Sequence, residues 1–186
     1  MNNNEKTIDA NVCGQIRSAN EISEMIKIME ELEKDFDRLS HSEDHELLNQ
    51  YGLGLVLSSR RLDRDPAFRY WTPADTIDGM PGDARAEFLY RPTYFAACIL
   101  KQAYATEENP HVRKQFETAL SQAMHACLGR GFSGHGYEAD EGFNDTMEIF
   151  EKAEMYSFVE KYPDINREFT FAYLKARRRW KAKESK

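Results

Sequence analysis

The most apolar stretch of this 186-residue chain is FLYRPTYFAACIL, residues 88–100. A helix that is apolar on every side is normally buried, so we expect this segment at the centre of the fold. Its one charged residue is Arg91, which directly precedes Pro92. Proline lacks the backbone N–H and disfavours helical angles at the residue before it, so we expect Pro92 to kink or divide the helix.

The segment that follows has a clear helix start. Asn109 is a good capping residue, and Pro110 suits the first helical position. Gly129 stands where a helix commonly ends. Apolar residues recur between them at three- and four-residue spacing, which predicts a helix with one buried face: Val112, Phe116, Leu120, Ala123 and Cys127.

Capping signals also mark two earlier helices. Ser18 opens a capping box, and apolar residues then follow at helical spacing over 22–39. Thr72 followed by Pro73 marks a short helix. Residues 1–17 are polar and without periodicity, so we expect a mobile N-terminal arm.

Between these two helices, Ser42 is expected to cap a helix that runs to about residue 62. Gly52 and Gly54 lie inside it. Each glycine costs a helix about 1 kcal/mol relative to alanine, so we expect them where a neighbouring helix packs closely.

The C-terminal third predicts two further helices. Asn144 is expected to cap the first, and Tyr162-Pro163-Asp164 separates it from the last. The expected core residues of the pair are Met147, Phe150, Met155, Phe158, Val159, Phe169, Tyr173 and Trp180.

No window of the sequence alternates at period two for more than a few residues, so no sheet is expected. The predicted fold is all-α, a single compact domain over residues 18–186 with about seven helices. Cap-and-proline pairs that open helices are also compatible with stacked helical hairpins. A glycine-rich loop would join two long helices, and the last helix would end in a basic segment.

The net charge of −7 is unevenly distributed. Residues 175–186 contain seven basic residues and one acid, which leaves the rest of the chain at −13. An acidic body argues against a general nucleic-acid-binding domain, although the basic tail, with Trp180 among its cations, is a possible local contact. Cations near a helix C-terminus also interact favourably with the negative end of the helix dipole. This interaction alone explains the basic residues of the tail, without a binding partner.

No segment has the roughly 20 apolar residues of a membrane span, and the N-terminus lacks the pattern of a secretion signal. A soluble cytoplasmic protein without membrane contact is therefore expected. The cysteines, Cys13, Cys98 and Cys127, are odd in number and contain no CxxC pair, so neither a disulfide framework nor a zinc site is predicted. Cys98 and Cys127 lie in apolar helical stretches and are expected in the core.

The main candidate site is the segment 129–136, which has four glycines in eight residues. It satisfies G-x-G-x-x-G, but a dinucleotide fold needs a strand before that motif and a helix directly after it, and neither is predicted here. Backbone N–H groups of such a loop can still bind an anion. The alternative is a compact connection in which Phe132 and Tyr137 fill the core.

Arg91 is the second candidate, because an unpaired guanidinium is costly to bury. Glu87, four residues earlier, offers a simple helical ion pair. If Pro92 divides the helix, Arg91 could instead face the glycine-rich loop. The site hypothesis then takes His135 as general acid or base and the following residues as ligand-binding: Arg91, Arg130, Ser133, Tyr137 and Glu138.

No metal or cofactor is predicted. His41 and His45 are four residues apart, but the HExxH arrangement and a third ligand are missing. The acidic run over residues 138–148 does not have the spacing of an EF-hand loop.

Two functional hypotheses follow. The first is an interaction or regulatory protein that recognises a protein partner, or a second copy of itself, through helical surfaces. The second is a small enzyme or binding protein for a phosphate- or carboxylate-bearing molecule, held by Arg91 and Arg130 beside His135. The sequence leaves open whether the protein is an enzyme.

Overall fold

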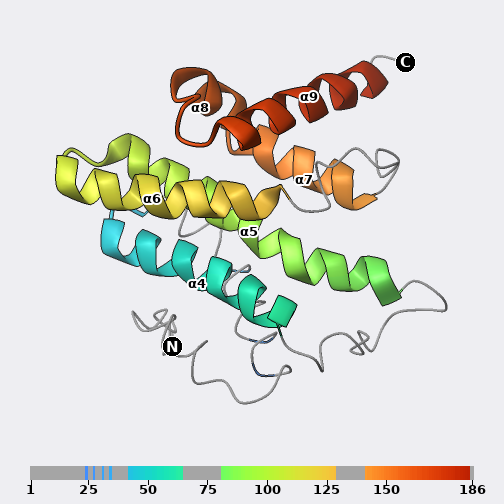
Figure 1. Cartoon of the computed structure of the whole chain (residues 1–186), viewed down its shortest axis with the longest axis horizontal. Coiled ribbons are helices and arrows are strands. Elements are labelled where there is room, and N and C mark those ends of the chain that lie inside the picture. Colours follow the sequence, from blue (N-terminus) through green and yellow to red (C-terminus); the bar gives the residue numbers. More distant parts are fainter. Residues whose placement is uncertain are drawn as a thin grey trace, which may run out of the picture.

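The computed structural model contains six helices and no strand among the residues it describes (Figure 1). The backbone is described at residues 24, 27, 31, 34, 42–64, 81–128 and 141–184, and side chains at all of these except 58–63, 81–91, 141, 142 and 184. The helices are α4 (His45–Arg64), α5 (Pro81–Thr106), α6 (Pro110–Cys127), α7 (Glu141–Lys152), α8 (Met155–Lys161) and α9 (Arg167–Glu184).

The all-α prediction is therefore confirmed for the described part, with six helices there instead of about seven. Residues 24, 27, 31 and 34 are helical, in agreement with the expected first helix. The N-terminal arm over 1–17, the short helix after Thr72 and the glycine-rich loop lie outside the described residues.

Helix α5 is the central element, as its composition predicts. Residues 92–100 are nine successive buried positions, so neighbours cover α5 on every side. α4 and α6 both run antiparallel to α5 and pack against it (Figure 1). Pro92 lies inside α5 without dividing it, so of the two expected alternatives, a kink or a division, the division is ruled out. Packing on all sides holds the helix together where proline removes one backbone hydrogen bond.

Close packing between α4 and α5 explains one of the two glycines. A Cβ atom on Gly52 would lie 2.7 Å from Cγ of Leu100, a side chain with no exposed surface. Leu48, Leu55 and Val56 of the same helix are buried beside it. The prediction that a glycine in this helix marks close helix packing is confirmed at Gly52.

The start of α4 differs from its prediction. Asp44, rather than Ser42, caps the helix, because its Oδ1 accepts a hydrogen bond from the N–H of Leu47 at 3.0 Å. Ser42 supports this cap, since its Oγ accepts from the N–H of Asp44 at 3.1 Å. Serine and aspartate are both good capping residues, and the carboxylate also favours the positive end of the helix dipole.

Helix α6 begins as predicted. Asn109 has extended backbone angles and accepts a hydrogen bond from the N–H of His111, and Pro110 occupies the first helical position. The helix ends at Cys127 with Leu128 as its C-cap, and Gly129 is not described. Its predicted apolar face is buried at Phe116, Leu120, Ala123 and Cys127, while Val112 is half-buried.

The three C-terminal helices lie on the side of α5 and α6 opposite α4 (Figure 1). Asn144 is not a cap: α7 already begins at Glu141, and Phe143 is buried in its first turn. An acid at the start of a helix and a buried aromatic residue in its first turn favour this earlier start. The single helix expected over 144–159 is in fact two, because Glu154 has a φ of 54° and ends α7.

Asn166 fixes the beginning of α9. Its Oδ1 accepts from the N–H of Phe169 at 3.0 Å, and its Nδ2 donates to the carbonyl of Ser121 in α6 at 3.0 Å. One side chain therefore caps α9 and joins it to α6. The predicted break over 162–164 is confirmed.

Aromatic rings form the core between α5, α7 and α9. Phe150 makes edge-to-face contacts with Tyr94, Phe169 and Tyr173 at centroid distances of 5.6, 5.8 and 5.5 Å. Such pairs contribute about 0.5–1.5 kcal/mol each beyond their buried area. Phe150 of α7 therefore contacts both α5 and α9.

Over the described ranges, no helix is both long enough and apolar enough to cross a bilayer.

Candidate functional site

Of the predicted site residues, the structure describes only the backbone of Arg91. Arg91 lies in α5, one residue before the buried run, and its side chain is not described. The other predicted residues lie outside the described part: Arg130, Ser133, His135, Tyr137 and Glu138. Their convergence on one pocket, and the anionic ligand it would hold, therefore stay a prediction.

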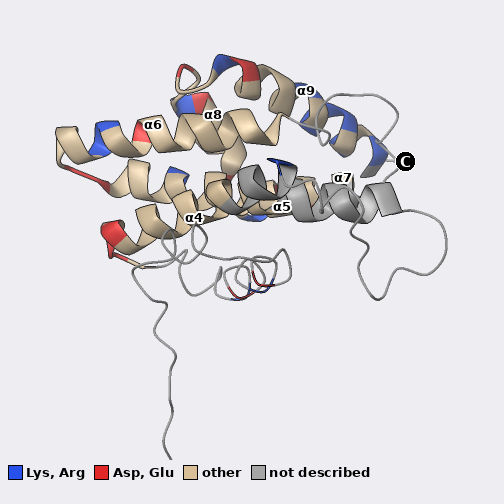
Figure 2. Cartoon of the chain, turned by 60° about the horizontal axis from the view of Figure 1, so that its bottom comes forward, with Lys and Arg blue, Asp and Glu red and all other residues tan. Residues whose placement is uncertain are grey.

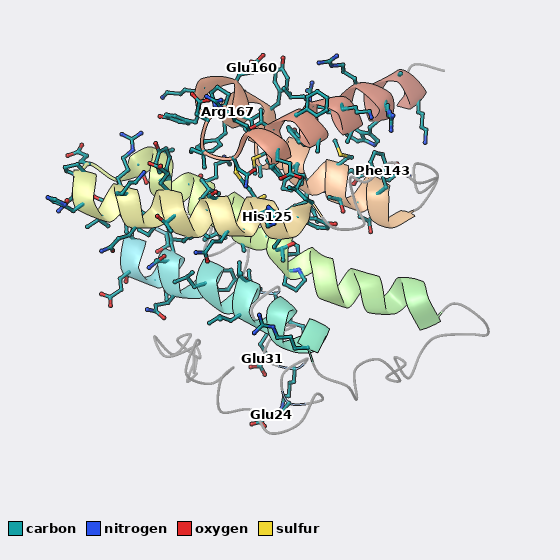
Figure 3. All side chains as sticks on the ribbon, viewed as in Figure 1. Glu24, Glu31, His125, Phe143, Glu160 and Arg167 are labelled. Atoms are coloured by element: carbon teal, nitrogen blue, oxygen red, sulfur yellow. The ribbon has the colours of Figure 1, made fainter. Side chains whose placement is uncertain are left out.

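The histidines of the described part contribute no metal site. His45 contacts a carboxylate, and His41 is not described. Among the described residues, no group of three His, Cys, Asp or Glu side chains is placed to hold a metal ion. His125 is exposed on α6, as its position on the polar face of that helix predicts (Figure 3).

His45 instead joins the start of α4 to the end of α5. Its Nδ1 lies 2.5 Å from Oε2 of Glu107 and its Nε2 lies 3.1 Å from Oγ1 of Thr106. The ring packs edge-to-face on Phe116 of α6 at 5.8 Å. One imidazole therefore touches three structural elements, and the order carboxylate, imidazole, hydroxyl is the one found in hydrolase triads.

The hydrogen bonds of Thr106 do not support a triad. Its Oγ1 donates to the carbonyl of Gln102 at 3.0 Å, so the hydroxyl proton is directed to that carbonyl and away from the ring of His45. A nucleophile needs the opposite direction. The N–H of Asn109, followed by the bond from His45, holds the pKa of Glu107 below its ordinary value. The hydrogen bonds among His45, Thr106 and Glu107 therefore have a structural role, since they join the start of α4 to the end of α5.

The two cysteines of the described part are buried, as predicted. Cys127 donates to the carbonyls of Ala123 and Thr93 at 3.1 and 3.3 Å, which joins α6 to α5. Burial raises the pKa of Cys98 to about 12 and also raises the pKa of Cys127. Since the thiolate is the nucleophile, neither cysteine is a catalytic candidate near neutral pH.

The inward-facing bases of α9 are neutralised by α7. Arg177 donates from Nε and Nη2 to the two carboxylate oxygens of Glu151, at 3.0 and 2.8 Å, and its guanidinium lies 4.1 Å from the ring centroid of Tyr156. Lys181 lies 3.7 Å from the same carboxylate. These hydrogen bonds and charges hold the pKa of Glu151 below its ordinary value, the Arg177 bond contributing most. Part of the basic tail therefore has a structural role.

The outer face of α9 is different. Phe171 is 73% exposed and is the one large apolar side chain that is exposed in the described part of the chain. Arg167, Lys175 and Arg178 are exposed at positions four before, four after and seven after it, which places all four on one side of the helix. We call these four residues the α9 outer face. Basic residues recur along α9 in Figure 2, and Figure 3 labels Arg167 at its start.

Sequence reasoning missed Phe171. Phe169 and Tyr173 are four residues apart and share the buried face, whereas Phe171, two residues from each, must lie on the opposite side. That spacing is the signal that identifies it. Trp180 is 6% exposed, in agreement with its expected place in the core. A nucleic-acid contact of the basic tail stays a prediction, and in this packing it would not include base stacking on Trp180.

Comparison of the chain with protein-family models, with curated proteins and with solved structures gives no match.

Proposed function

We propose that this is an interaction protein that binds an acidic, amphipathic segment of a partner protein along the α9 outer face. The observation that carries the proposal is the exposure of Phe171 between basic residues. Aromatic residues, phenylalanine included, and arginine are enriched in protein interfaces relative to the rest of the surface.

The charges around Phe171 support an acidic partner. Lys175 and Arg178 are exposed, and neither forms an ion pair with another described residue. Arg167 pairs with Asp164 at 2.7 Å, but both side chains are largely exposed, so this pair contributes little. The cationic end of the face therefore points toward the C-terminus of α9, where acidic groups of a partner would be attracted.

The apolar part of the face is small, since it consists of one aromatic ring. Small interfaces of this kind suit reversible contacts better than permanent assemblies. A reversible contact fits a regulatory role. The proposal includes a cytoplasmic location, with which the unpaired, buried thiols of Cys98 and Cys127 are compatible.

The test uses a synthetic helical peptide with leucines at three- and four-residue spacing and glutamates beside them. Its binding to the full chain is measured by fluorescence anisotropy at low and moderate salt. Phe171→Ser and Arg178→Glu are each expected to weaken binding about tenfold or more, because the first removes the anchor and the second adds repulsion. Lys152→Glu is the matched control, since Lys152 is exposed on α7 and forms no ion pair with another described residue.

Equal binding by wild type, Phe171→Ser and Arg178→Glu would overturn the proposal. Sedimentation of the same proteins tests whether a second copy of this chain binds to the α9 outer face instead. Self-association of the wild type that is lost in Phe171→Ser would replace the acidic partner by a second copy of this chain.

A further inference from the structure

A second group of cations lies where α5, α6 and α8 meet. Its base is a set of three aromatic rings, Tyr104, Phe158 and Tyr162, whose centroids are 5.0 to 6.1 Å apart. Tyr104 comes from α5, Phe158 from α8, and Tyr162 directly follows α8. We call these residues the aromatic triad.

Three basic side chains lie against the triad. The guanidinium of Arg113 is 4.5 Å from the ring centroid of Tyr104 and 5.8 Å from that of Tyr162. Nζ of Lys101 is 5.7 Å from the centroid of Phe158, and Nζ of Lys161 is 5.1 Å from that of Tyr162. Three elements, α5, α6 and α8, therefore bring positive charge to one place.

These cations differ from the other bases of the same region. Lys114, Arg167 and Arg177 each pair with a carboxylate. Within the described residues, Lys101, Arg113 and Lys161 have no carboxylate within ion-pair distance.

The aromatic faces compensate the positive charge only in part. A cation–π contact contributes about 0.5–2 kcal/mol and leaves the charge itself in place. Burial lowers the pKa of Lys101, and Lys161, more than Arg113, lowers the pKa of Tyr162. Only the shift of Tyr162 reflects neighbouring positive charge, since burial causes the shift of Lys101 and the charge of Glu154 opposes it. The buried Nε of Arg113 also has no hydrogen-bond partner.

The hydroxyl of Tyr162 completes the donor set. It accepts a hydrogen bond from Nη2 of Arg113 at 3.3 Å, so its own proton remains available for another acceptor. An anion beside this hydroxyl would receive one neutral and several charged donors. Tetrahedral dianions use such a set better than a carboxylate, because they carry more charge and more acceptor oxygens.

We propose that Arg113, Lys161, Lys101 and the hydroxyl of Tyr162 form a binding site for a phosphate group. The site is separate from the α9 outer face and does not depend on the proposed function. It also differs from the predicted glycine-rich site, since it uses none of the same residues. The phosphate could belong to a free phosphorylated small molecule or to a phosphorylated side chain of a protein.

The experiment measures binding of inorganic phosphate to the full chain by titration calorimetry and by the shift in melting temperature, at constant ionic strength. Wild type is expected to bind saturably. Arg113→Met keeps the length of the side chain and is expected to weaken binding about tenfold or more. Lys161→Gln and Tyr162→Phe are expected to weaken it several-fold, and Lys152→Gln, which removes an exposed lysine elsewhere, is expected to change nothing.

Lys161 is exposed, so Lys161→Gln tests the site even if Arg113→Met does not fold. Absence of saturable binding by wild type would overturn the proposal, as would equal binding by Lys161→Gln, Tyr162→Phe and Lys152→Gln. A phosphoserine peptide and free O-phosphoserine, compared under the same conditions, distinguish the two sources. Tighter binding of the peptide supports a phosphoprotein, and equal binding supports a small molecule.

Discussion

The two halves of this molecule pack by different means. In α4, α5 and α6, small residues let the helices approach closely: Gly52 meets Leu100, and Ala96, Ala97 and Ala103 are buried along α5. In α7, α8 and α9, large rings fill the space between helices, and charged groups join them.

The difference shows that the stability of one buried core can depend on side-chain volume in two opposite ways. Where small residues meet, stability depends on the absence of extra volume. Where rings meet, it depends on volume that must not be removed. Three substitutions test this contrast.

The largest effect is expected from Phe150→Ala, which removes the ring that touches α5 and α9 together. Loss of a buried phenylalanine costs about 3–5 kcal/mol of unfolding free energy. Denaturant unfolding of the full chain measures it. Phe171→Ala is the matched control, and because Phe171 is exposed it should change the unfolding free energy by less than about 0.5 kcal/mol. Equal losses in the two variants would contradict the assignment of Phe150 to the centre of this half.

A smaller loss is expected from Gly52→Ala. Alanine favours helix by about 1 kcal/mol, but its Cβ would clash with Leu100, and overpacking costs about 1–3 kcal/mol. The net change should therefore be destabilising. In the background of Leu100→Ala, which makes room, the same substitution should be neutral or stabilising, and denaturant unfolding of the double-mutant cycle measures the coupling. A more stable single variant would mean that the two helices are not in close contact.

The smallest effect concerns the Glu151–Arg177 pair, whose side chains are 34% and 23% exposed. Glu151→Gln should cost about 1 kcal/mol at pH 7 and low salt, because solvent screens a pair of this exposure. The folded state lowers the pKa of Glu151, so its contribution is complete above the unfolded-state pKa and is lost as the pH falls through the folded-state pKa. Unfolding curves from pH 7 to acid should therefore converge for variant and wild type.

Glu148→Gln removes an exposed carboxylate of the same helix and serves as the control for this series. A difference between Glu151→Gln and wild type that persists in strong acid would assign the effect to packing instead of charge.

The sequence predicts the parts of this fold that depend on local chemistry. Asn109-Pro110 marks the start of α6 because a capping side chain and a fixed proline angle act within a few residues. The central place of α5 follows from its apolar character, and the glycine in α4 indicates a close neighbour.

Predictions fail where several local solutions compete. Ser42 and Asp44 are both good caps, and only the structure shows which one is used. The division of α7 from α8 depends on Glu154, whose left-handed conformation is uncommon for a residue other than glycine. Pro92 lies inside an undivided helix because tertiary packing outweighs a local preference.

Candidate sites are harder to predict, because they depend on which faces meet. Arg113 and Lys161 are far apart in the sequence, and no motif joins them. Their meeting at Tyr104 and Tyr162 requires the packing of α6 against α8. The predicted residues at 130–138 lie outside the described part, so the structure leaves that hypothesis open.

The buried thiols of Cys98 and Cys127 allow opening of the folded state to be followed by thiol labelling. A thiol reagent in water reaches these buried thiols only when the core around them opens, so the rate of labelling measures how often that opening occurs. With Cys13 replaced by serine, mass spectrometry after timed exposure would follow this opening in the absence of denaturant. Comparing that rate with the unfolding rate would tell whether the two halves open together or one at a time.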